Sequence, residues 1–218
     1  MTNFSDLWPL TGNVTDLFVA GKTLGEWQQE LGENFSVTYP WDLLDLNEKL
    51  LSLFTENKNA GLAQVDGVLI VGEGTKVLPG VYVEGIVNIG KNCKIGPNCY
   101  LRGSTTIGDN CHVGQAVELK NCIIGHGSAV GHLTYLGDSV LGEKVNLGAG
   151  TITSNLRHDG KNHRSQVNEK LVETGRRKLG AIIGNGVHTG IHTAIYPGRK
   201  LGPGTCTRPG EVVANDLF

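Results

Sequence analysis

The chain has 218 residues, and its 19 basic and 21 acidic side chains nearly balance, which excludes a simple polybasic binder of nucleic acids or membranes. Glycine accounts for 32 residues, about twice the usual ~7% share, but without the strict period of three that marks collagen. The five cysteines contain no CxxC pair, no apolar run approaches a membrane span, and no secretory leader is visible. We therefore expect a cytoplasmic protein with reduced thiols.

Residues 1–60 form a first region, which contains all three tryptophans, Trp8, Trp27 and Trp41. Leucines recur at helical spacing after Pro40, and this pattern predicts an amphipathic helix over 42–54. A second, weaker helix is predicted over 24–31. We expect this N-terminal appendage to pack on the first coil of the domain that follows, or on a partner, and so to cover an open end.

An aliphatic residue returns every six positions in the next part of the chain, at Val71, Val77, Val83, Ile89, Ile95, Leu101, Ile107, Val113 and Leu119. A small or β-branched residue follows each of the first eight by four positions, at Thr75, Val81, Val87, Cys93, Cys99, Thr105, Cys111 and Val117. A period of six fits neither a helix nor a heptad, but it is a multiple of the strand period of two.

This repeat predicts a mainly β fold, a parallel β-helix over residues 61–213 with three hexads in each coil. Successive coils then stack about 4.8 Å apart. The cysteines at the small inward positions are expected to be buried packing residues rather than reactive thiols.

The repeat slips by one residue twice, between Leu119 and Ile124 and between Leu136 and Leu141. Regular hexads stop at Thr153 and resume at Ile183. The polar stretch 153–181 is therefore predicted to be a long loop that leaves the helix, and long loops inside compact domains are usually functional or disordered.

Stacking places Arg102 and Lys120, three hexads apart, at the same outward position of adjacent coils. Two neighbouring cations repel unless an anion bridges them, which indicates a phosphate site. The alternative is a solvated pair that Glu118 neutralises.

His132 lies three residues before Tyr135, and Ala149 falls one coil further on. A histidine near an aromatic ring and two cations has the chemistry of a general base. Asn146, at a corner of the next coil, is a candidate polar partner. The alternative is an exposed turn histidine with no role.

The remaining histidines are possible zinc ligands, because His158 and His163 are five residues apart and His188 and His192 four apart. A zinc site needs a third ligand at a matching coil, and the residue two coils before His158 is Cys122. The spacing favours no metal site.

The two segments AVGHLTYLGD (129–138) and NLGAGTITSN (146–155) are distinctive. They resemble the acetyltransferase domain of the bifunctional N-acetylglucosamine-1-phosphate uridyltransferase/glucosamine-1-phosphate acetyltransferase. RRKLGAIIGNGVHTGIHTAIY (176–196) and YPWDLL (39–44) look more like the archaeal-type sugar-1-phosphate nucleotidylyltransferases that carry the same β-helix, the latter segment being similar to their linker helix. The resemblance extends over about residues 39–213.

This resemblance implies a left-handed β-helix, a homotrimer and acetyl-CoA as co-substrate, with no metal. It makes His132 the general base that takes a proton from the 2-amino group of glucosamine 1-phosphate, and it makes the backbone N–H of Ala149 the group that meets the oxyanion. The residues that it assigns to the sugar phosphate are Arg102, Lys120, Tyr135, Asn146, Asn155 and Lys161.

For the residues that contact acetyl-CoA, positive charge is the only indication that the sequence offers. The candidates for its phosphates are Arg164, Arg176, Arg177 and Lys178, and a solvated run of charge is an equal alternative. Two residues depart from the family patterns. Leu156 stands where the uridyltransferase type has an aromatic residue, and Arg164 stands where the archaeal type has lysine, which keeps the charge but changes its geometry.

The sequence thus predicts an acetyl-CoA-dependent N-acetyltransferase acting on an amino-sugar phosphate, with glucosamine 1-phosphate favoured. The segment before the linker, 1–38, is too short for a nucleotide-binding α/β domain, so we expect no nucleotidyl transfer. One alternative is the same chemistry on another amino sugar. A second is a non-catalytic β-helix that serves as an oligomerisation or regulatory partner of a separate nucleotidyltransferase chain, and a third is a zinc-dependent hydratase.

Overall fold

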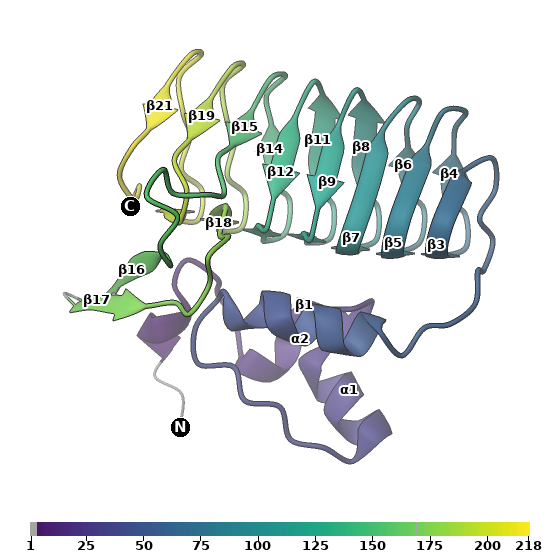
Figure 1. Cartoon of the computed structure of the whole chain (residues 1–218), viewed down its shortest axis with the longest axis horizontal. Helices are drawn as coiled ribbons and strands as arrows, with labels where there is room; N and C mark the ends of the chain where they lie inside the picture. The colour runs from purple at the N-terminus through teal and green to yellow at the C-terminus, as the bar shows by residue number, and fades with distance from the viewer. Residues whose placement is uncertain (1–3, 169) are drawn as a thin grey trace.

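The computed structural model describes residues 4–168 and 170–218. Most of the chain winds into a parallel β-solenoid of about 8 turns, with the N-terminal residues packed along one side of it (Figure 1). The predicted mainly β, parallel β-helix is therefore confirmed. No helix of the described residues is long and apolar enough to cross a membrane.

The described residues form two long sheets and two antiparallel hairpins. The 12-stranded sheet contains β3 (Gln64–Val71), β5 (Tyr82–Ile89), β7 (Tyr100–Ile107), β9 (Glu118–Lys120), β10 (Ile123–Ile124), β12 (Tyr135–Gly137), β13 (Val140–Leu141), β15 (Ile152–Thr153), β18 (Ala181–Ile183), β19 (Ala194–Ile195), β20 (Arg199–Leu201) and β21 (Val212–Val213). The 5-stranded sheet contains β4 (Lys76–Val77), β6 (Lys94–Ile95), β8 (His112–Gln115), β11 (Ala129–His132) and β14 (Asn146–Leu147). The hairpins are β1 (Phe18–Val19) with β2 (Lys22–Thr23), and β16 (Arg164–Val167) with β17 (Lys170–Glu173).

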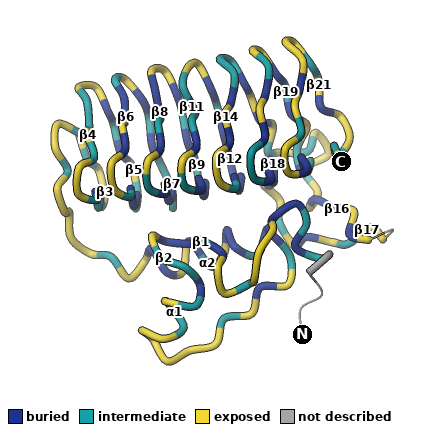
Figure 2. Tube along the Cα trace, turned by 180° about the vertical axis from the view of Figure 1, so that it is seen from behind, coloured by how far each residue is buried: buried dark blue, intermediate teal, exposed yellow. Residues whose placement is uncertain are grey.

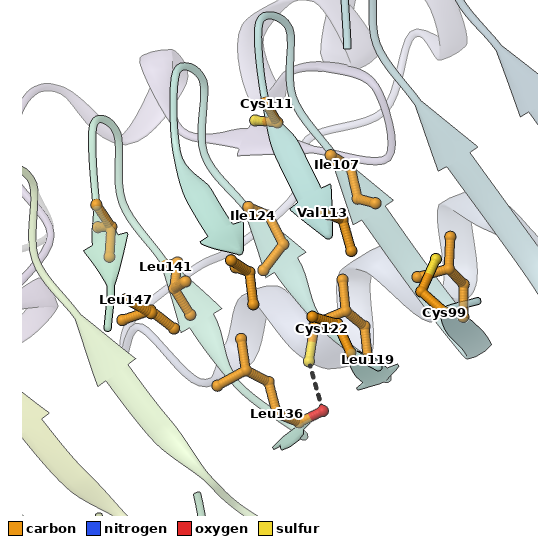
Figure 3. Packing of buried hydrophobic residues seen from close by; sticks show 14 of the residues in the cluster. Cys99, Ile107, Cys111, Val113, Leu119, Cys122, Ile124, Leu136, Leu141 and Leu147 are labelled. Atoms are coloured by element: carbon orange, nitrogen blue, oxygen red, sulfur yellow. Dashed lines mark hydrogen bonds between the residues drawn. The ribbon is translucent and has the colours of Figure 1, made fainter. Parts of the chain in front are cut away.

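The hexad residues point into the solenoid and form one continuous apolar core (Figure 3). Leu101 and Leu119, which pair in adjacent strands, are fully buried. The cysteines at the small inward positions, Cys93, Cys99 and Cys111, are buried free thiols, as predicted. These side chains fill the interior because inward positions of successive coils stack directly on one another.

Each of the two slips in the repeat shortens a coil by one residue. Ile107 pairs with Ile124, and Ile124 pairs with Leu141, so each step falls one residue short of three full hexads. In the full-length coils one long strand runs through the corner, which needs glycine because a Cβ on Gly67 would lie 2.0 Å from the carbonyl oxygen of Gly85. In the shortened coils this long strand is replaced by two short ones, beginning with β9 and β10.

The two predicted helices are present in the appendage. Helix α1 (Leu24–Leu31) begins after Thr23, whose side chain forms a capping box with Glu26. Helix α2 (Asp42–Leu51) ends three residues before the predicted boundary at Phe54. The chain continues there in tighter turns, because the N–H of Phe54 donates to the carbonyl of Leu51, only three residues back, at 2.9 Å.

The appendage lies along one flank of the solenoid (Figures 1 and 2), so the expectation that it covers the open end is wrong for its helices. Outward residues on this flank are apolar, and Ile123, Val140 and Ile182 join a buried cluster with Trp27 and Trp41 of the appendage. Burial of this apolar strip stabilises the packing of the helices along the flank.

A buried asparagine on α2 anchors this helix to the flank of the solenoid. Asn47 donates to the carbonyl of Ser104 at 2.9 Å and accepts from the hydroxyl of Thr106 at 2.7 Å. The first coil is instead covered by the short segment after the helix, where Lys58 hydrogen-bonds along β3 and Ala60 packs on the core.

The excursion from the solenoid leaves after β15 and returns at β18, close to the predicted limits of 153 and 181. It is not a structureless loop, because it carries the hairpin β16–β17. Its neck is closed where the N–H of Leu179 donates to the carbonyl of Asn155 at 2.9 Å. His163 is buried beneath it, with Nε2 3.1 Å from the same carbonyl oxygen, and burial lowers the pKa of this histidine.

Candidate active site

Arg102 and Lys120 stack in register on the outer surface of the 12-stranded sheet, as predicted. Arg102 also binds Glu118, the residue opposite Tyr100 in the next coil, with Nε and NH2 at 2.7 and 2.6 Å from Oε1. Both side chains are about one-third exposed, at 31% and 33%. Glu118 therefore neutralises part of the arginine's charge but leaves its other N–H donors open to a ligand.

Lys120 is less well compensated than Arg102. Its ammonium lies 3.9 Å from the carboxylate of Asp138, and Lys178 lies beside it. Burial lowers the pKa of Lys120, and the charges of Lys178 and Arg102 lower it further against the opposing effect of Asp138. Partly buried cations that are short of counter-charge favour an anionic ligand such as a phosphate.

The carboxylate of Asp138 is shared by several residues of this surface, and the side chain is only 3% exposed. It accepts hydrogen bonds from Asn155 Nδ2 at 2.7 Å and from Asn121 Nδ2 at 3.2 Å. Asn155 Nδ2 also lies 3.3 Å from the hydroxyl of Tyr135. The structure thus brings the predicted residues Tyr135, Asn155 and Lys120 together around Asp138, which is not one of the predicted site residues. Its position one short coil after Asn121 is the signal that could have found it.

Two of the residues proposed for the co-substrate's phosphates join this cluster. The guanidinium of Arg176 forms an ion pair with Asp45 on α2 and lies 3.9 Å from Asp138, and its side chain is 15% exposed. Lys178 lies next to Lys120. Arg176 and Lys178, together with Arg177 and Asp45, line a surface pocket of about 270 Å³. We call the set of Arg102, Lys120, Tyr135, Asp138, Asn155, Arg176 and Lys178 the cation cluster.

His132 and Asn146 belong to the other sheet, and Ala149 lies in the turn that follows it. His132 ends β11 and Asn146 begins β14, the neighbouring strand of the 5-stranded sheet. The register of these strands sets His132 opposite Ala149, and the N–H of Gly150 donates to the carbonyl of His132 at 3.0 Å. Within the described residues, the N–H of Ala149 has no hydrogen-bond acceptor and the His132 ring has no hydrogen-bond partner.

The predicted site residues of one chain are therefore divided into two groups by the corner at Leu133, which has a left-handed backbone with φ 51°. Tyr135 begins the 12-stranded side of this corner, and His132 ends the 5-stranded side. No hydrogen bond or ion pair between described residues joins His132, Asn146 or Ala149 to the cation cluster.

Lys161 and Arg164 lie apart from both groups. The backbone N–H of Lys161 donates to Asp159 at 3.1 Å, and Arg164 faces Glu173 across the β16–β17 hairpin at 3.9 Å. Near the base of the excursion a surface pocket of about 490 Å³ is lined by Ser154, Leu156, Arg157, His158, Asp159, Tyr196 and Pro197.

The candidate zinc ligands are separated in space. The thiol of Cys122 is buried inside the solenoid, where it donates to the carbonyl of Leu136 at 3.3 Å (Figure 3), whereas His158 lines the external pocket. In the described ranges, no group of three His, Cys, Asp or Glu side chains is arranged to hold a metal ion.

Several curated proteins are similar to this chain over most of its length. It is 42% identical over 182 residues to the bifunctional sugar-1-phosphate nucleotidylyltransferase/acetyltransferase of Sulfurisphaera tokodaii, a match that covers 82% of this chain and 45% of that protein. It is 39% identical over 181 residues to the bifunctional protein GlmU of Methanococcus aeolicus, covering 82% and 44%. The chain spans less than half the length of these relatives.

Solved structures with a similar course include a mutant of AntD, an N-acyltransferase from Bacillus cereus, at 19% identity, covering 67% of this chain and 73% of that one, with a TM-score of 0.40. The model of the GMPPB C-terminal domain matches residues 65–176, just over half of the chain. The hexad strands from β4 to β15, the corner at Leu133 and most of the cation cluster fall inside that match, whereas β18 to β21 lie beyond it. The chain therefore belongs to the family of the GMPPB C-terminal domain.

Proposed function

We propose that the protein is an acetyl-CoA-dependent N-acetyltransferase that acts on an amino-sugar phosphate, with glucosamine 1-phosphate as the favoured acceptor. The observation that carries the proposal is the pairing of His132 with Ala149. An imidazole and a backbone N–H, neither with a partner among the described residues, lie opposite each other on adjacent coils. Acyl transfer needs this combination, a base for the attacking amine and a donor for the developing oxyanion.

The acceptor's phosphate is assigned to the cation cluster. Arg102, Lys120 and Lys178 supply positive charge, and among the described residues the carboxylates of Glu118 and Asp138 pair with Arg102 and Lys120. Tyr135 and Asn155 supply hydroxyl and amide groups suited to sugar hydroxyls. Lys178 is therefore proposed to bind the acceptor's phosphate, whereas its charge alone had suggested a contact with the phosphates of acetyl-CoA.

In the proposed reaction, His132 removes a proton from the acceptor's amino group while the amine nitrogen bonds to the thioester carbonyl carbon. The N–H of Ala149 stabilises the negative charge that develops on the carbonyl oxygen. The carbon–sulfur bond then breaks, and the thiolate leaves and takes up a proton. Acetyl-CoA supplies the acyl group, and the chain's residues supply the base, the oxyanion donor and the acceptor's orientation.

The homotrimer belongs to this proposal. His132 and the cation cluster lie on different sheets of one chain, on either side of the corner at Leu133. A neighbouring copy that packs against this corner can bring its own groups next to those of the first, so that each complete site contains residues of two chains. The Lys161 side chain forms no hydrogen bond or ion pair with the cluster among the described residues of one chain, so we assign it to a neighbouring site.

A thiol-release assay tests the proposal. The purified chain is incubated with acetyl-CoA and, separately, glucosamine 1-phosphate, galactosamine 1-phosphate or glucosamine 6-phosphate, and free CoA is followed. Release that depends on one 1-phosphate supports the activity and names the acceptor. A folded chain that releases no CoA with any amino sugar and binds no acetyl-CoA refutes the enzyme and favours the non-catalytic partner.

A further inference from the structure

Asp138 is a buried charge at a place where the fold does not require one. It sits at a left-handed corner, φ 51°, and the equivalent corner of the preceding coil is occupied by Asn121 with the same φ. Asparagine favours this backbone conformation at least as well as aspartate. A neutral side chain thus suffices for the turn, whereas a buried carboxylate needs compensation by cations and hydrogen-bond donors.

The compensation comes from residues of the candidate site. Asn155 donates to Asp138 Oδ2 and lies in hydrogen-bond reach of the Tyr135 hydroxyl, so both hydrogens of its amide are engaged inside the cluster. Its carbonyl oxygen, Oδ1, receives no hydrogen bond from any described residue and is left to accept from a ligand. Lys120 lies 3.9 Å from the same carboxylate with its side chain 16% exposed, and among the described residues its ammonium pairs with no other acidic side chain.

A second set of contacts joins this carboxylate to the appendage. Arg176 lies between Asp138 on the solenoid and Asp45 on α2, and its Nε also donates to the carbonyl of Lys178 at 3.3 Å. One guanidinium thereby connects three parts of the chain, the coil, the excursion and the helix. Arginine suits such a bridge because its donors are arranged in a rigid, planar fork.

We propose that Asp138 is the positioning residue of the acceptor site, that its carboxylate orients Asn155 and Lys120 toward a sugar phosphate, and that Arg176 links this arrangement through Asp45 to helix α2. The proposal rests on the proposed function for the identity of the acceptor. The positioning itself rests on the contacts within the chain. It gives the appendage a part in acceptor binding through Asp45, which pairs with Arg176 and is not itself assigned to the acceptor.

The first experiment replaces Asp138 by asparagine, which fits the left-handed corner as Asn121 does. We expect KM for the acceptor to rise about 10-fold or more, with kcat changed by less than about 3-fold. The loss of hydrogen bonds to a charged group costs roughly the free energy that corresponds to a 10-fold change in KM. Asp66→Asn, an exposed carboxylate on β3, is the matched control and should change neither constant.

A second readout needs no enzyme activity. The reaction of the Lys120 amine with acetic anhydride is followed by peptide mass spectrometry as a function of pH, with exposed Lys91 as internal reference. Removing the negative charge of Asp138 removes its attraction for the Lys120 ammonium, while the repulsion from Lys178 and Arg102 remains. Half-maximal labelling should therefore move to lower pH in Asp138→Asn and stay in place in Asp66→Asn. An unshifted Lys120 profile with an unchanged KM overturns the proposal.

The link to α2 is tested by Asp45→Asn and Arg176→Gln, which leave the Asp138 corner intact. We expect KM for the acceptor to rise about 2- to 5-fold for Asp45→Asn and more for Arg176→Gln, which loses both ion pairs. Unchanged KM values in both variants refute the link even if Asp138→Asn does not fold. If the wild-type chain transfers no acetyl group, the proposed function fails, while the Lys120 labelling profile still decides whether Asp138 positions that lysine.

Discussion

Arg102 on β7 holds Glu118 on β9 through two nitrogen–oxygen contacts of 2.6 and 2.7 Å, so the first cation of the candidate phosphate site already has a carboxylate partner. A phosphate must share the guanidinium with Glu118. We expect Glu118→Gln to lower KM for the sugar phosphate by about 2- to 5-fold, because removing one negative charge strengthens the attraction of the acceptor.

Varying the ionic strength distinguishes an electrostatic change in KM from one caused by an altered shape of the site. The decrease in KM for Glu118→Gln should be largest in low salt and disappear at about 0.5 M salt, because the Arg102–Glu118 pair is partly exposed and salt screens charges on the surface. Steady-state kinetics at two salt concentrations measure it. A KM that rises in both salts contradicts the competition and makes Glu118 a direct sugar contact.

His132→Ala is expected to lower kcat by about 10² to 10⁴ while the chain keeps its fold, because the variant loses the base and leaves the neighbouring strand pairs untouched. Lys76→Ala, an exposed residue on the same sheet three coils earlier, should keep wild-type turnover. The thiol-release assay measures both variants, and circular dichroism checks the fold. Wild-type turnover in His132→Ala excludes it as the general base.

Thiol reactivity should distinguish one cysteine from the other four. Cys206 is exposed, whereas Cys93, Cys99, Cys111 and Cys122 are buried. Burial raises the pKa of both Cys99 and Cys122 to about 12, so these thiols are protonated as well as shielded at pH 8. We expect one rapid equivalent with Ellman's reagent, lost in Cys206→Ser, and further equivalents only in denaturant. Several rapid equivalents in the native chain contradict the closed core.

The hexad period is sufficient to predict the solenoid because each coil repeats the same physical requirement, an inward apolar residue followed by a small one. It also locates the two short coils, which the pairing of Ile107 with Ile124 and of Ile124 with Leu141 confirms. The path of the appendage could not be predicted in the same way. It depends on the outward residues Ile123, Val140 and Ile182, which the six-residue period does not mark.

The candidate site was predictable only in part for a similar reason. Register alone gives the stacking of Arg102 on Lys120. Asp138 and Arg176 meet because the excursion returns against both the solenoid and α2, a contact among segments that are distant in sequence. Charge in the sequence identified Arg176 as a cation but not its partners.

The closeness of stacked coils can be tested with two glycines that lie opposite each other. A Cβ on Gly114 would lie 1.8 Å from the carbonyl oxygen of Gly131, whereas a Cβ on Gly131 would meet nothing within 4 Å. We expect Gly114→Ala to lower the free energy of unfolding by about 2 kcal/mol or more, because backbone of the next coil must move. Gly131→Ala should change it by less than about 0.5 kcal/mol. Urea titrations compare the two, and equal effects contradict the packing of these coils.

The stability of the solenoid's far end should depend on pH through Lys200. Its side chain donates to the main-chain carbonyl of Gln166 and lies 5.2 Å from the ring of Trp8, and burial lowers its pKa. At pH values between this lowered pKa and the ~10.4 of an unfolded lysine, the unfolded chain binds more protons than the folded chain. The contribution of Lys200 therefore makes the free energy of unfolding increase as the pH rises through this range. Lys200→Met should remove that gain, whereas Lys91→Met, at an exposed site, should keep it. Urea midpoints at pH 7.5 and 9.5 measure the difference, and an identical pH dependence in wild type and Lys200→Met contradicts a buried ammonium at this position.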